Sequence, residues 1–265
     1  MTQPPQFDLP RSLSVDLHDN VAVLCLSRPE KRNALDAETI RGIDRFFSDL
    51  PSAIHAVIIR GNGDHFCAGA DLGMIAEIAD SSTLFGSQEY HRAFDRIEHS
   101  RVPVIAVLHG AVVGGGLELA AAAHIRVAER GTYYALPEGM RGIFVGGAGS
   151  VRIPRLIGVP RMTDMILTGR TYGAELGEAI GLSQYVVEPG AGLTKGLELA
   201  KLAATNLPVT NFAIIRALPL IARVDPEAGS LLESLMFTAT TAQDETRQRL
   251  RAFLNKQAPK VSHHT

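Results

Sequence analysis

The sequence predicts an α/β fold followed by a helical C-terminal region. Through most of the chain, short apolar runs typical of strands alternate with patterns typical of amphipathic helices. Strands that alternate with helices pair in parallel through right-handed crossovers. From Thr194 onward the pattern is almost entirely helical. We therefore expect an α/β core over residues 1–192 and a helical extension over residues 193–265, suited to subunit packing and to covering a site.

The first part of the chain predicts a hairpin, a helix and a third strand. Leu13–His18 and Val21–Ser27 are β-rich runs separated by an Asp-Asn pair, which suits a hairpin. Asp36 is placed to cap a helix whose apolar residues recur every three or four positions. A strand at Ala56–Arg60 follows.

The middle of the chain continues the alternation. Helical patterns cover Leu72–Ala79 and Gln88–His99, and Val104–Leu108 is a short apolar strand bounded by turn signals. An apolar helix at Leu117–Ala123 leads to a strand at Ile125–Ala128.

The C-terminal region predicts three helices. They cover Leu193–Leu207, Asn211–Ala222 and Pro226–Asn255. The third carries acids and arginines on one face, which is typical of a helix with a solvated side.

Composition bounds the possible partners. With 265 residues, 46% of them hydrophobic and 20% charged, the chain has ample material for a large core. A formal net charge of -2 and a pI near 6.5 give no broad attraction to nucleic acid or anionic lipid. We therefore expect neither nucleic acid nor membrane as a partner.

The lack of a recognisable targeting signal and the presence of only two cysteines favour a cytoplasmic protein. Residues 1–10 lack a cationic segment followed by an apolar one, and no apolar run approaches about 18 residues. Cys25 and Cys67 are the only cysteines, and no His/Cys cluster has zinc spacing. We expect a cytoplasmic protein with two reduced thiols and no metal.

Three glycine-rich turns lie beside apolar strands or helix starts. They are Phe66–Asp71, Gly114–Gly116 and Gly146–Ser150. Glycine lets a ligand approach backbone N–H groups, although tight turns alone would also explain any single glycine pair. None of the three matches GxGxxG in context, and the chain has no GK[ST], so dinucleotide and nucleoside triphosphate sites are poor fits.

Two glutamates follow these turns. Glu118 comes two residues after the triple glycine and opens a helix otherwise fit for burial, where a carboxylate is costly unless it is partnered or functional. The helix dipole would also favour an acid there. Glu138 follows Pro137 and by itself would be read as an exposed loop acid. Together with the glycine turns, the pair favours a catalytic site.

The ordered motifs resemble those of the enoyl-CoA hydratase/isomerase (crotonase) family, from about Val15 to Lys256. The matching stretches are Ser27–Leu35, Phe66–Asp71, Val113–Ala120, Leu136–Gly139, Gly146–Gly149 and Arg155–Gly158, with 20 residues between the two glutamates. The resemblance implies the crotonase (ClpP-like) spiral of β-β-α units, with a CoA-thioester site in the core at residues 1–192. It also implies a trimer or a dimer of trimers, a role in fatty acid metabolism, and no cofactor beyond the coenzyme A of the substrate.

The resemblance assigns roles to five residues. The N–H groups of Ala70 and Gly115 would form an oxyanion hole for the thioester oxygen, where charge develops. Glu118 would deprotonate the attacking water, Glu138 would protonate Cα, and the N–H of Gly146 would help to hold the water. The implied reaction is hydration of a 2-enoyl-CoA.

The same resemblance implies where coenzyme A is held. It places the adenosine end near Lys31, Arg32 and Ala34, where cations meet phosphate, although both cations could equally be solvated loop charges. It extends the substrate-binding set to Ala68, Asp71 and Leu72. From position alone, Asp71 is most simply the N-cap of the helix after it.

Two departures from the family pattern concern the acyl group. His124 stands where many members have Asp, and Phe144-Val145 replaces a common Pro. Four residues are candidates to shape a pocket for a short, aromatic or sulfur-bearing acyl group, although core packing would equally explain at least half of them: Tyr133, Tyr134, Met140 and Phe144. The stretch Leu136–Arg152 is also similar to members that hydrate methylthioacryloyl-CoA and then hydrolyse the thioester. A thioester hydrolase, an enoyl-CoA isomerase and a non-catalytic binding member therefore stay open as alternatives.

Overall fold

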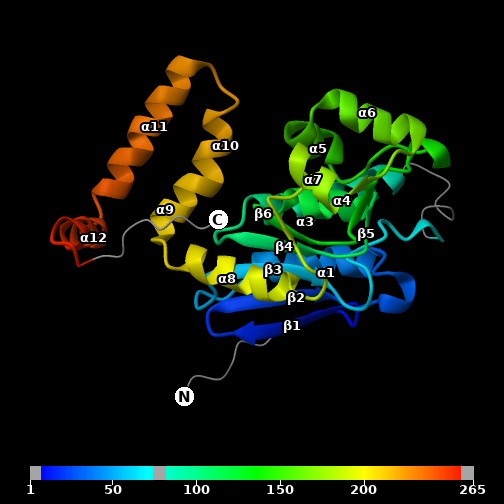
Figure 1. The fold of residues 1–265 in the computed structure, drawn as a ribbon, viewed down its shortest axis with the longest axis horizontal. Helices are drawn as coiled ribbons and strands as arrows, with labels where there is room; N and C mark the ends of the chain where they lie inside the picture. Colours follow the sequence, from blue (N-terminus) through cyan, green and yellow to red (C-terminus); the bar gives the residue numbers. More distant parts are fainter. Residues whose placement is uncertain (1–6, 74–81, 258–265) are drawn as a thin grey trace. The chain divides into compact units, whose positions relative to one another are not determined.

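The computed structural model describes residues 7–73 and 82–257 (Figure 1). It divides after Ala204 into two compact units. The boundary therefore falls later than the one expected from the sequence between residues 192 and 193.

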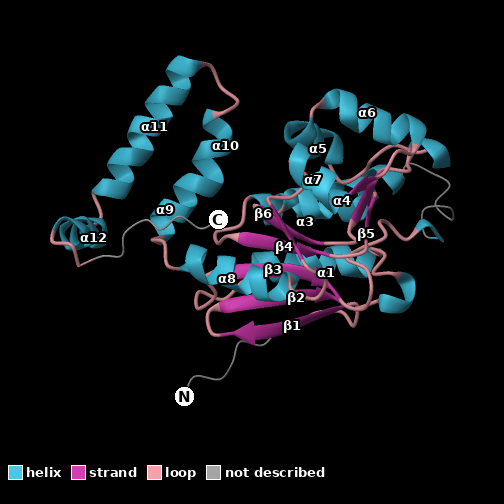
Figure 2. Ribbon diagram, viewed as in Figure 1, coloured by secondary structure: helices cyan, strands magenta, loops and turns pink. Residues whose placement is uncertain are grey.

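A six-stranded sheet forms the frame of the first unit (Figure 2). In spatial order its strands are β1 (Leu13–His18), β2 (Val21–Leu26), β3 (Ala56–Gly61), β4 (Val104–Leu108), β6 (Ile125–Glu129) and β9 (Tyr185–Val187). The β1–β2 pair is antiparallel, which confirms the predicted hairpin, and the other neighbours are parallel. Parallel pairing requires a crossover between successive strands, and these crossovers carry the helices.

A second sheet consists of three short strands. It contains β5 (Ala111–Val113), β7 (Tyr133–Ala135) and β8 (Tyr172–Gly173). Strand β5 follows β4 after a two-residue break and leads into α4 (Gly115–Ala122), so one β-β-α unit spans both sheets. This alternation of parallel strands and helices confirms the predicted α/β core. Strands of two or three residues show no sequence periodicity, and these three were not predicted.

Both faces of the main sheet are buried along its central strands β2, β3 and β4. On β2, the side chains of Ala22, Leu24 and Leu26 join one apolar cluster, and those of Val21, Val23 and Cys25 join the other. This alternation follows from the two-residue period of a strand. A strand covered on both sides reads as a continuous apolar run, as the sequence of β2 does.

Helices cover these faces. In the first unit they are α1 (Ala37–Ser48), α3 (Ser82–Glu98), α4, α5 (Gly149–Ile157), α6 (Val159–Thr168), α7 (Ala174–Ile180) and α8 (Gly192–Ala204), with short 3₁₀ turns at Pro29–Lys31 (η1) and Gly139–Arg141 (η2). The predicted cap of α1 is confirmed, because the Asp36 carboxylate accepts the N–H of Thr39 at 2.8 Å. The helix expected over residues 72–79 falls mostly outside the described residues.

Helix α8 explains where the first unit ends. Leu199 and Ala200 belong to the apolar cluster on one face of the main sheet. A side-chain carbon built on Gly196 would lie 2.7 Å from a methyl carbon of Val107, so this helix packs closely on β4. Because its apolar face is buried against the sheet, α8 belongs to the core, although its sequence is purely helical.

The second unit is helical. It contains α9 (Pro208–Phe212), a π-helical stretch η3 (Ala213–Ala217), α10 (Leu218–Ile221), α11 (Pro226–Thr241) and α12 (Asp244–Leu254). The single helix predicted over residues 226–255 is wrong, because Gln243 has extended backbone angles of φ -73 and ψ 134. Asp244 and Glu245 then lie in the first turn of α12, where acids favour a new helix start. Over the described residues, no helix combines the length and apolar character that crossing a membrane requires.

Candidate active site

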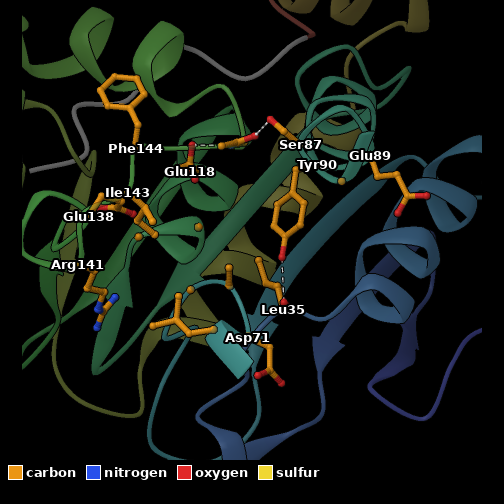
Figure 3. A pocket seen from close by; sticks show the side chains of 18 of the residues that line it. Leu35, Asp71, Ser87, Glu89, Tyr90, Glu118, Glu138, Arg141, Ile143 and Phe144 are labelled. Atoms are coloured by element: carbon orange, nitrogen blue, oxygen red, sulfur yellow. Dashed lines mark hydrogen bonds between the residues drawn. The ribbon is translucent and has the colours of Figure 1, made fainter. Parts of the chain in front are cut away.

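A cavity of about 410 Å³ collects residues from five separate segments of the first unit. Its walls come from residues 35–37, 68–72, 86–90, 114–118 and 138–147. Figure 3 shows Ser87 and Tyr90 of α3 on one side, with Glu118, Glu138 and Ile143 across from them. All five residues expected to be catalytic, Ala70, Gly115, Glu118, Glu138 and Gly146, line this cavity.

The backbone around Ala70 turns one N–H group toward the cavity. Ala70 forms a parallel bridge with Leu35, and the bonds of that bridge run from the Leu35 N–H to the Gly69 carbonyl and from the Asp71 N–H to the Leu35 carbonyl. The flanking groups therefore pair with Leu35, and the N–H of Ala70 points to the opposite side. This leaves it available to a ligand in the cavity.

The N–H of Gly115 is the second donor. Gly115 is the first residue of α4, and the first N–H groups of a helix have no partner within it. A side-chain carbon built on Gly115 would lie 3.3 Å from the amide nitrogen of Ala70, so the two backbone segments approach closely. The N-terminal end of α4 adds its positive dipole end to these two donors.

The glycines on either side of Gly115 are also confined. Gly114 has φ of 52, and a side-chain carbon there would lie 2.8 Å from Oε1 of Glu138. A side-chain carbon on Gly116 would lie 2.4 Å from the carbonyl oxygen of Cys67. The triple glycine therefore allows the turn Phe66–Asp71 and the Glu138 side chain to reach the start of α4.

Glu118 is buried and is held by backbone donors. Its side chain is in the first turn of α4, and the residue is 3% exposed. Oε1 accepts the N–H groups of Gly147 and Gly149, both at 2.8 Å. Burial raises the pKa of Glu118, and the N–H groups of Gly149, Gly147 and Gly146 counteract that rise. The donors favour the ionised form of a carboxyl that burial alone would protonate.

Glu138 is buried without such partners. The residue is 6% exposed, and its Oε2 atom makes no hydrogen bond to any described residue. Burial raises the pKa of Glu138 to about 7, and the negative charge of Glu118 contributes to the rise. Near neutral pH a substantial fraction of this carboxyl is therefore protonated.

These two carboxyls can act as an acid and a base on the same bound molecule. Environments that push two pKa values apart are the physical basis of acid/base assignment. The two N–H donors of Ala70 and Gly115 can stabilise an oxygen that becomes negatively charged nearby. The cavity thus has the parts for a reaction that moves protons beside a carbonyl group.

The residues expected to bind the substrate separate into two groups. Ala68, Asp71 and Leu72 line the cavity. Lys31, Arg32 and Ala34 do not, and the two cations are exposed on and beside η1.

Arg28, which was not predicted as a site residue, connects the cavity residue Asp71 to the segment that contains Ala34. It contacts the carboxylates of Asp36 at 2.8 Å and Asp71 at 3.1 Å, and it donates to the Ala34 carbonyl. Asp71 is thereby tied to the loop that carries Lys31 and Arg32.

The residues expected to shape the acyl pocket are only partly found there. Phe144 lines the cavity, whereas Tyr133, Tyr134 and Met140 do not. Tyr134 is fully buried in the core against Gly177, which explains its absence from the cavity.

The side of the cavity formed by α3 was missed from the sequence. The Tyr90 hydroxyl donates to the Leu35 carbonyl at 2.9 Å, and the Ser87 hydroxyl donates to the Gly146 carbonyl at 2.6 Å. Helical spacing places these residues on one face, but nothing in the pattern indicates what that face meets.

His124 is a structural residue. Its Nδ1 accepts the N–H of Val104 at 2.9 Å, and its Nε2 lies 3.2 Å from the Glu98 carbonyl. Burial lowers the pKa of His124 to about 4, so the ring is neutral at ordinary pH. It does not line the cavity, so the departure from Asp at this position is no sign of an unusual acyl group. In the described part of the chain, no group of His, Cys, Asp and Glu is arranged to hold a metal ion.

Known proteins resemble the chain over almost its whole length. A model of the enoyl-CoA hydratase/isomerase family matches residues 16–263. YngF of Bacillus subtilis (strain 168), provisionally described as an enoyl-CoA hydratase/isomerase, is 33% identical over 246 residues, which cover 90% of this chain and 93% of YngF. The short-chain-enoyl-CoA hydratase of Clostridium acetobutylicum is 31% identical over 242 residues, which cover 89% of this chain and 92% of the relative.

A solved structure extends the likeness to three dimensions. It is the crystal structure of a Rhodopseudomonas palustris CGA009 protein, provisionally described as an enoyl-CoA hydratase. The two chains share 52% identity and a TM-score of 0.90, with 96% of this chain and 98% of that one covered.

Proposed function

The chain belongs to the enoyl-CoA hydratase/isomerase family, and on this premise we propose that it adds water across the 2,3 double bond of a 2-enoyl-CoA thioester. The observation that carries the proposal is the contrast between two buried carboxyls on one cavity. Backbone N–H groups oppose the effect of burial on Glu118 and favour its ionised form, whereas Glu138 has an unpartnered buried oxygen and a pKa of about 7. Hydration needs one base and one acid, and this contrast provides both.

In the proposed reaction the thioester oxygen accepts the N–H groups of Ala70 and Gly115. Glu118 takes a proton from water, and the water oxygen adds to the β-carbon. The electron pair of the double bond moves toward the thioester, so the thioester oxygen becomes an enolate oxygen. Preorganised donors stabilise that charge, and each such donor is typically worth about 3 kcal/mol in the transition state. When the enolate collapses, Glu138 delivers its proton to the α-carbon.

The N–H of Gly146 also contributes to the proposed reaction. The resemblance implies that it helps to hold the water, and Gly146 does line the cavity. Its N–H also lowers the pKa of Glu118, which places it on the same side as the proposed base. Water bound between Glu118 and Gly146 would be close to the carboxylate that takes its proton.

The proposal needs no metal or redox group, since coenzyme A enters as part of the substrate. The exposed Lys31 and Arg32 are proposed to meet its phosphates outside the cavity. A cytoplasmic trimer or dimer of trimers is proposed as well. Large apolar side chains exposed on the second unit, such as Phe237 at 69% and Leu254 at 77%, support subunit packing there. Sedimentation of the full chain tests the oligomeric state.

The experiment that tests the function is turnover of a panel of enoyl-CoA thioesters by the purified chain. Two signals are followed together, the absorbance of the conjugated thioester and the release of free thiol. Glu118→Gln and Glu138→Gln keep the size and polarity of each side chain and remove its acid/base chemistry. Loss of absorbance without thiol release, abolished in both variants, is the expected result.

Other outcomes would replace the proposal. Release of thiol would identify a thioester hydrolase, and a shifted double bond without added water would identify an isomerase. Binding of acyl-CoA with no turnover of any substrate would identify a binding protein. Full activity in Glu118→Gln would remove the acid/base assignment itself.

A further inference from the structure

A buried arginine lies directly behind the turn that holds Glu118. Arg152 is on α5 and is 5% exposed. Its Nη1 donates to the carbonyl of Gly147 at 3.1 Å, and its Nε donates to Glu98 at 2.7 Å. A further contact joins it to Asp95. Both acids are on α3, so the guanidinium group connects α3 to the glycine turn.

Arg152 bonds to the turn at a carbonyl that lies, in sequence, between the two N–H groups that donate to Glu118. The Gly147 carbonyl belongs to the peptide unit that precedes Ala148. The units on either side of it carry the N–H groups of Gly147 and Gly149, which both donate to Oε1 of Glu118. Arg152 therefore holds the peptide unit that lies between the two donor units of the turn.

The turn needs such support because its backbone is strained. Ala148 has φ of 62, a left-handed conformation that costs a residue with a side chain roughly 1 kcal/mol or more. Strained backbone persists where surrounding contacts determine it. The Ser87 hydroxyl holds the preceding carbonyl, that of Gly146, at 2.6 Å. Two contacts, one from Ser87 of α3 and one from Arg152 of α5, thus hold the conformation that lets two N–H groups converge on one oxygen.

We propose that Arg152 is a positioning residue for Glu118, acting through the Gly147 carbonyl. The inference rests on the proposed function, because it takes Glu118 as the base. A guanidinium fork suits this task, since its donors are coplanar and reach a carbonyl and two carboxylates at once. A purely structural connection between α3 and α5 would instead affect stability and leave the catalytic pH dependence unchanged.

The test compares Arg152→Met and Arg152→Lys with Arg155→Met in the full chain. Arg155 is on the same helix and is exposed, so its variant controls for loss of charge on α5. The measurements are kcat and KM for a 2-enoyl-CoA, the pH dependence of both, and Tm. Arg152→Lys keeps a positive charge beside the two acids, so it guards against a failure to fold.

The inference predicts a loss of kcat on the order of 10-fold to 100-fold in Arg152→Met, because a displaced base loses its alignment. KM should change little, since Arg152 does not line the cavity. The acidic limb of the rate profile should move to higher pH. Weaker N–H bonds to the Glu118 carboxylate would oppose the effect of burial less, so the pKa of Glu118 would rise further.

The other titratable groups that influence Glu118 are unchanged in these variants. They are Glu138, Tyr90 and His91. A shift of the acidic limb therefore reports on the turn rather than on a new charge beside the carboxyl.

An unchanged kcat and an unmoved acidic limb, with a lower Tm, would overturn the inference. Glu118→Gln separates this result from a failure of the proposed function. If Glu118→Gln is inactive while the Arg152 profiles match wild type, the positioning role is wrong and the base assignment stands. If Glu118→Gln is fully active, the proposed function itself is wrong. Arg152→Met with Glu98→Gln also removes one of the two acids that Arg152 contacts, and the kinetic defect should persist as Tm recovers.

Discussion

The N–H of Gly149 donates to Oε1 of Glu118 over 2.8 Å, and no side chain fits at that glycine. A carbon built there would lie 2.6 Å from both Cγ and Oε1 of Glu118. Both the close contact and the hydrogen bond require the Glu118 carboxylate to lie directly against the turn. A change at Gly149 therefore displaces Glu118 without altering its chemistry.

Gly149→Ala should lower kcat on the order of 100-fold, because the added methyl group pushes the carboxylate out of alignment. Steady-state kinetics with a 2-enoyl-CoA measure the loss. Gly173→Ala is the matched control, since a side-chain carbon at Gly173 meets nothing within 4 Å. Equal rates for the two variants would contradict the prediction.

Gly115→Ala should weaken the oxyanion hole. The new methyl group would lie 3.3 Å from the amide nitrogen of Ala70, where it would crowd the thioester oxygen. Loss of one donor predicts a decrease in kcat of about 100-fold to 1000-fold, with Tm nearly unchanged. Binding of a saturated acyl-CoA, measured by calorimetry, should weaken less than kcat falls. A parallel loss of both would indicate simple steric exclusion of the ligand.

The rate should decline as pH rises through about 7. Glu138 must be protonated to act as the acid, and its pKa in the folded protein is about 7. The profile of kcat/KM reports ionisations of the free enzyme, so its alkaline limb should lie near that value. Coupling between the two glutamates makes this a property of the pair. A profile that stays flat from pH 6 to 9 would exclude Glu138 as the acid.

Glu138 should also make folding stability depend on pH. Its pKa is raised from 4.5 to about 7 on folding, so the native state holds the proton more tightly than the unfolded chain does. This contribution is fully present below about pH 4.5 and is lost as pH rises through about 7. A shift of this size corresponds to about 3 kcal/mol at most.

Glu138→Gln removes that titration. The free energy of unfolding of the variant, relative to wild type, should therefore increase between pH 5 and pH 8.5. Urea denaturation at the two pH values measures it. Glu118 titrates in both proteins and largely cancels in the comparison. A constant difference between wild type and variant would contradict the prediction.

Both thiols should be inert in the folded protein. Burial raises the pKa of Cys67 to about 12 and also raises that of Cys25. Thiolate is the reactive form, so neither should react with a thiol reagent at pH 8 until urea unfolds the chain. Any thiol released during turnover would then come from coenzyme A. Rapid labelling of one thiol in the native state would show that its region opens locally.

The resemblance to a family predicted the parts of the site that lie on matching motifs. Ala70, Gly115 and the two glutamates all line one cavity, and the glycines of the turns beside Ala70 and Gly115 allow the close approach of these segments. The surroundings of those residues were not predictable. Arg152 and Glu98 are far apart in the chain, and neither residue type nor spacing reveals their contact.

The same distinction holds for the fold. The hairpin and the strands β3, β4 and β6 of the main sheet follow from local periodicity, whereas the three-residue strand β9 was not predicted. Helix α8 was assigned to the extension because helical periodicity is the same whether a helix covers a sheet or another helix. The break at Gln243 was missed because its neighbours are ordinary helix formers, and the signal lies in acids that also suit a helix interior.

The triple glycine before α4 also has an evolutionary consequence. A side chain at Gly114 would meet Glu138, one at Gly115 would crowd the Ala70 amide, and one at Gly116 would strike the Cys67 backbone. Two of the obstacles are backbone atoms of the turn Phe66–Asp71 and the third is the Glu138 side chain, so no one compensating substitution could relieve them all. Mutational routes to a new reaction on this scaffold would have to leave these three positions fixed. Diversification would then proceed through the side chains that face the bound acyl group.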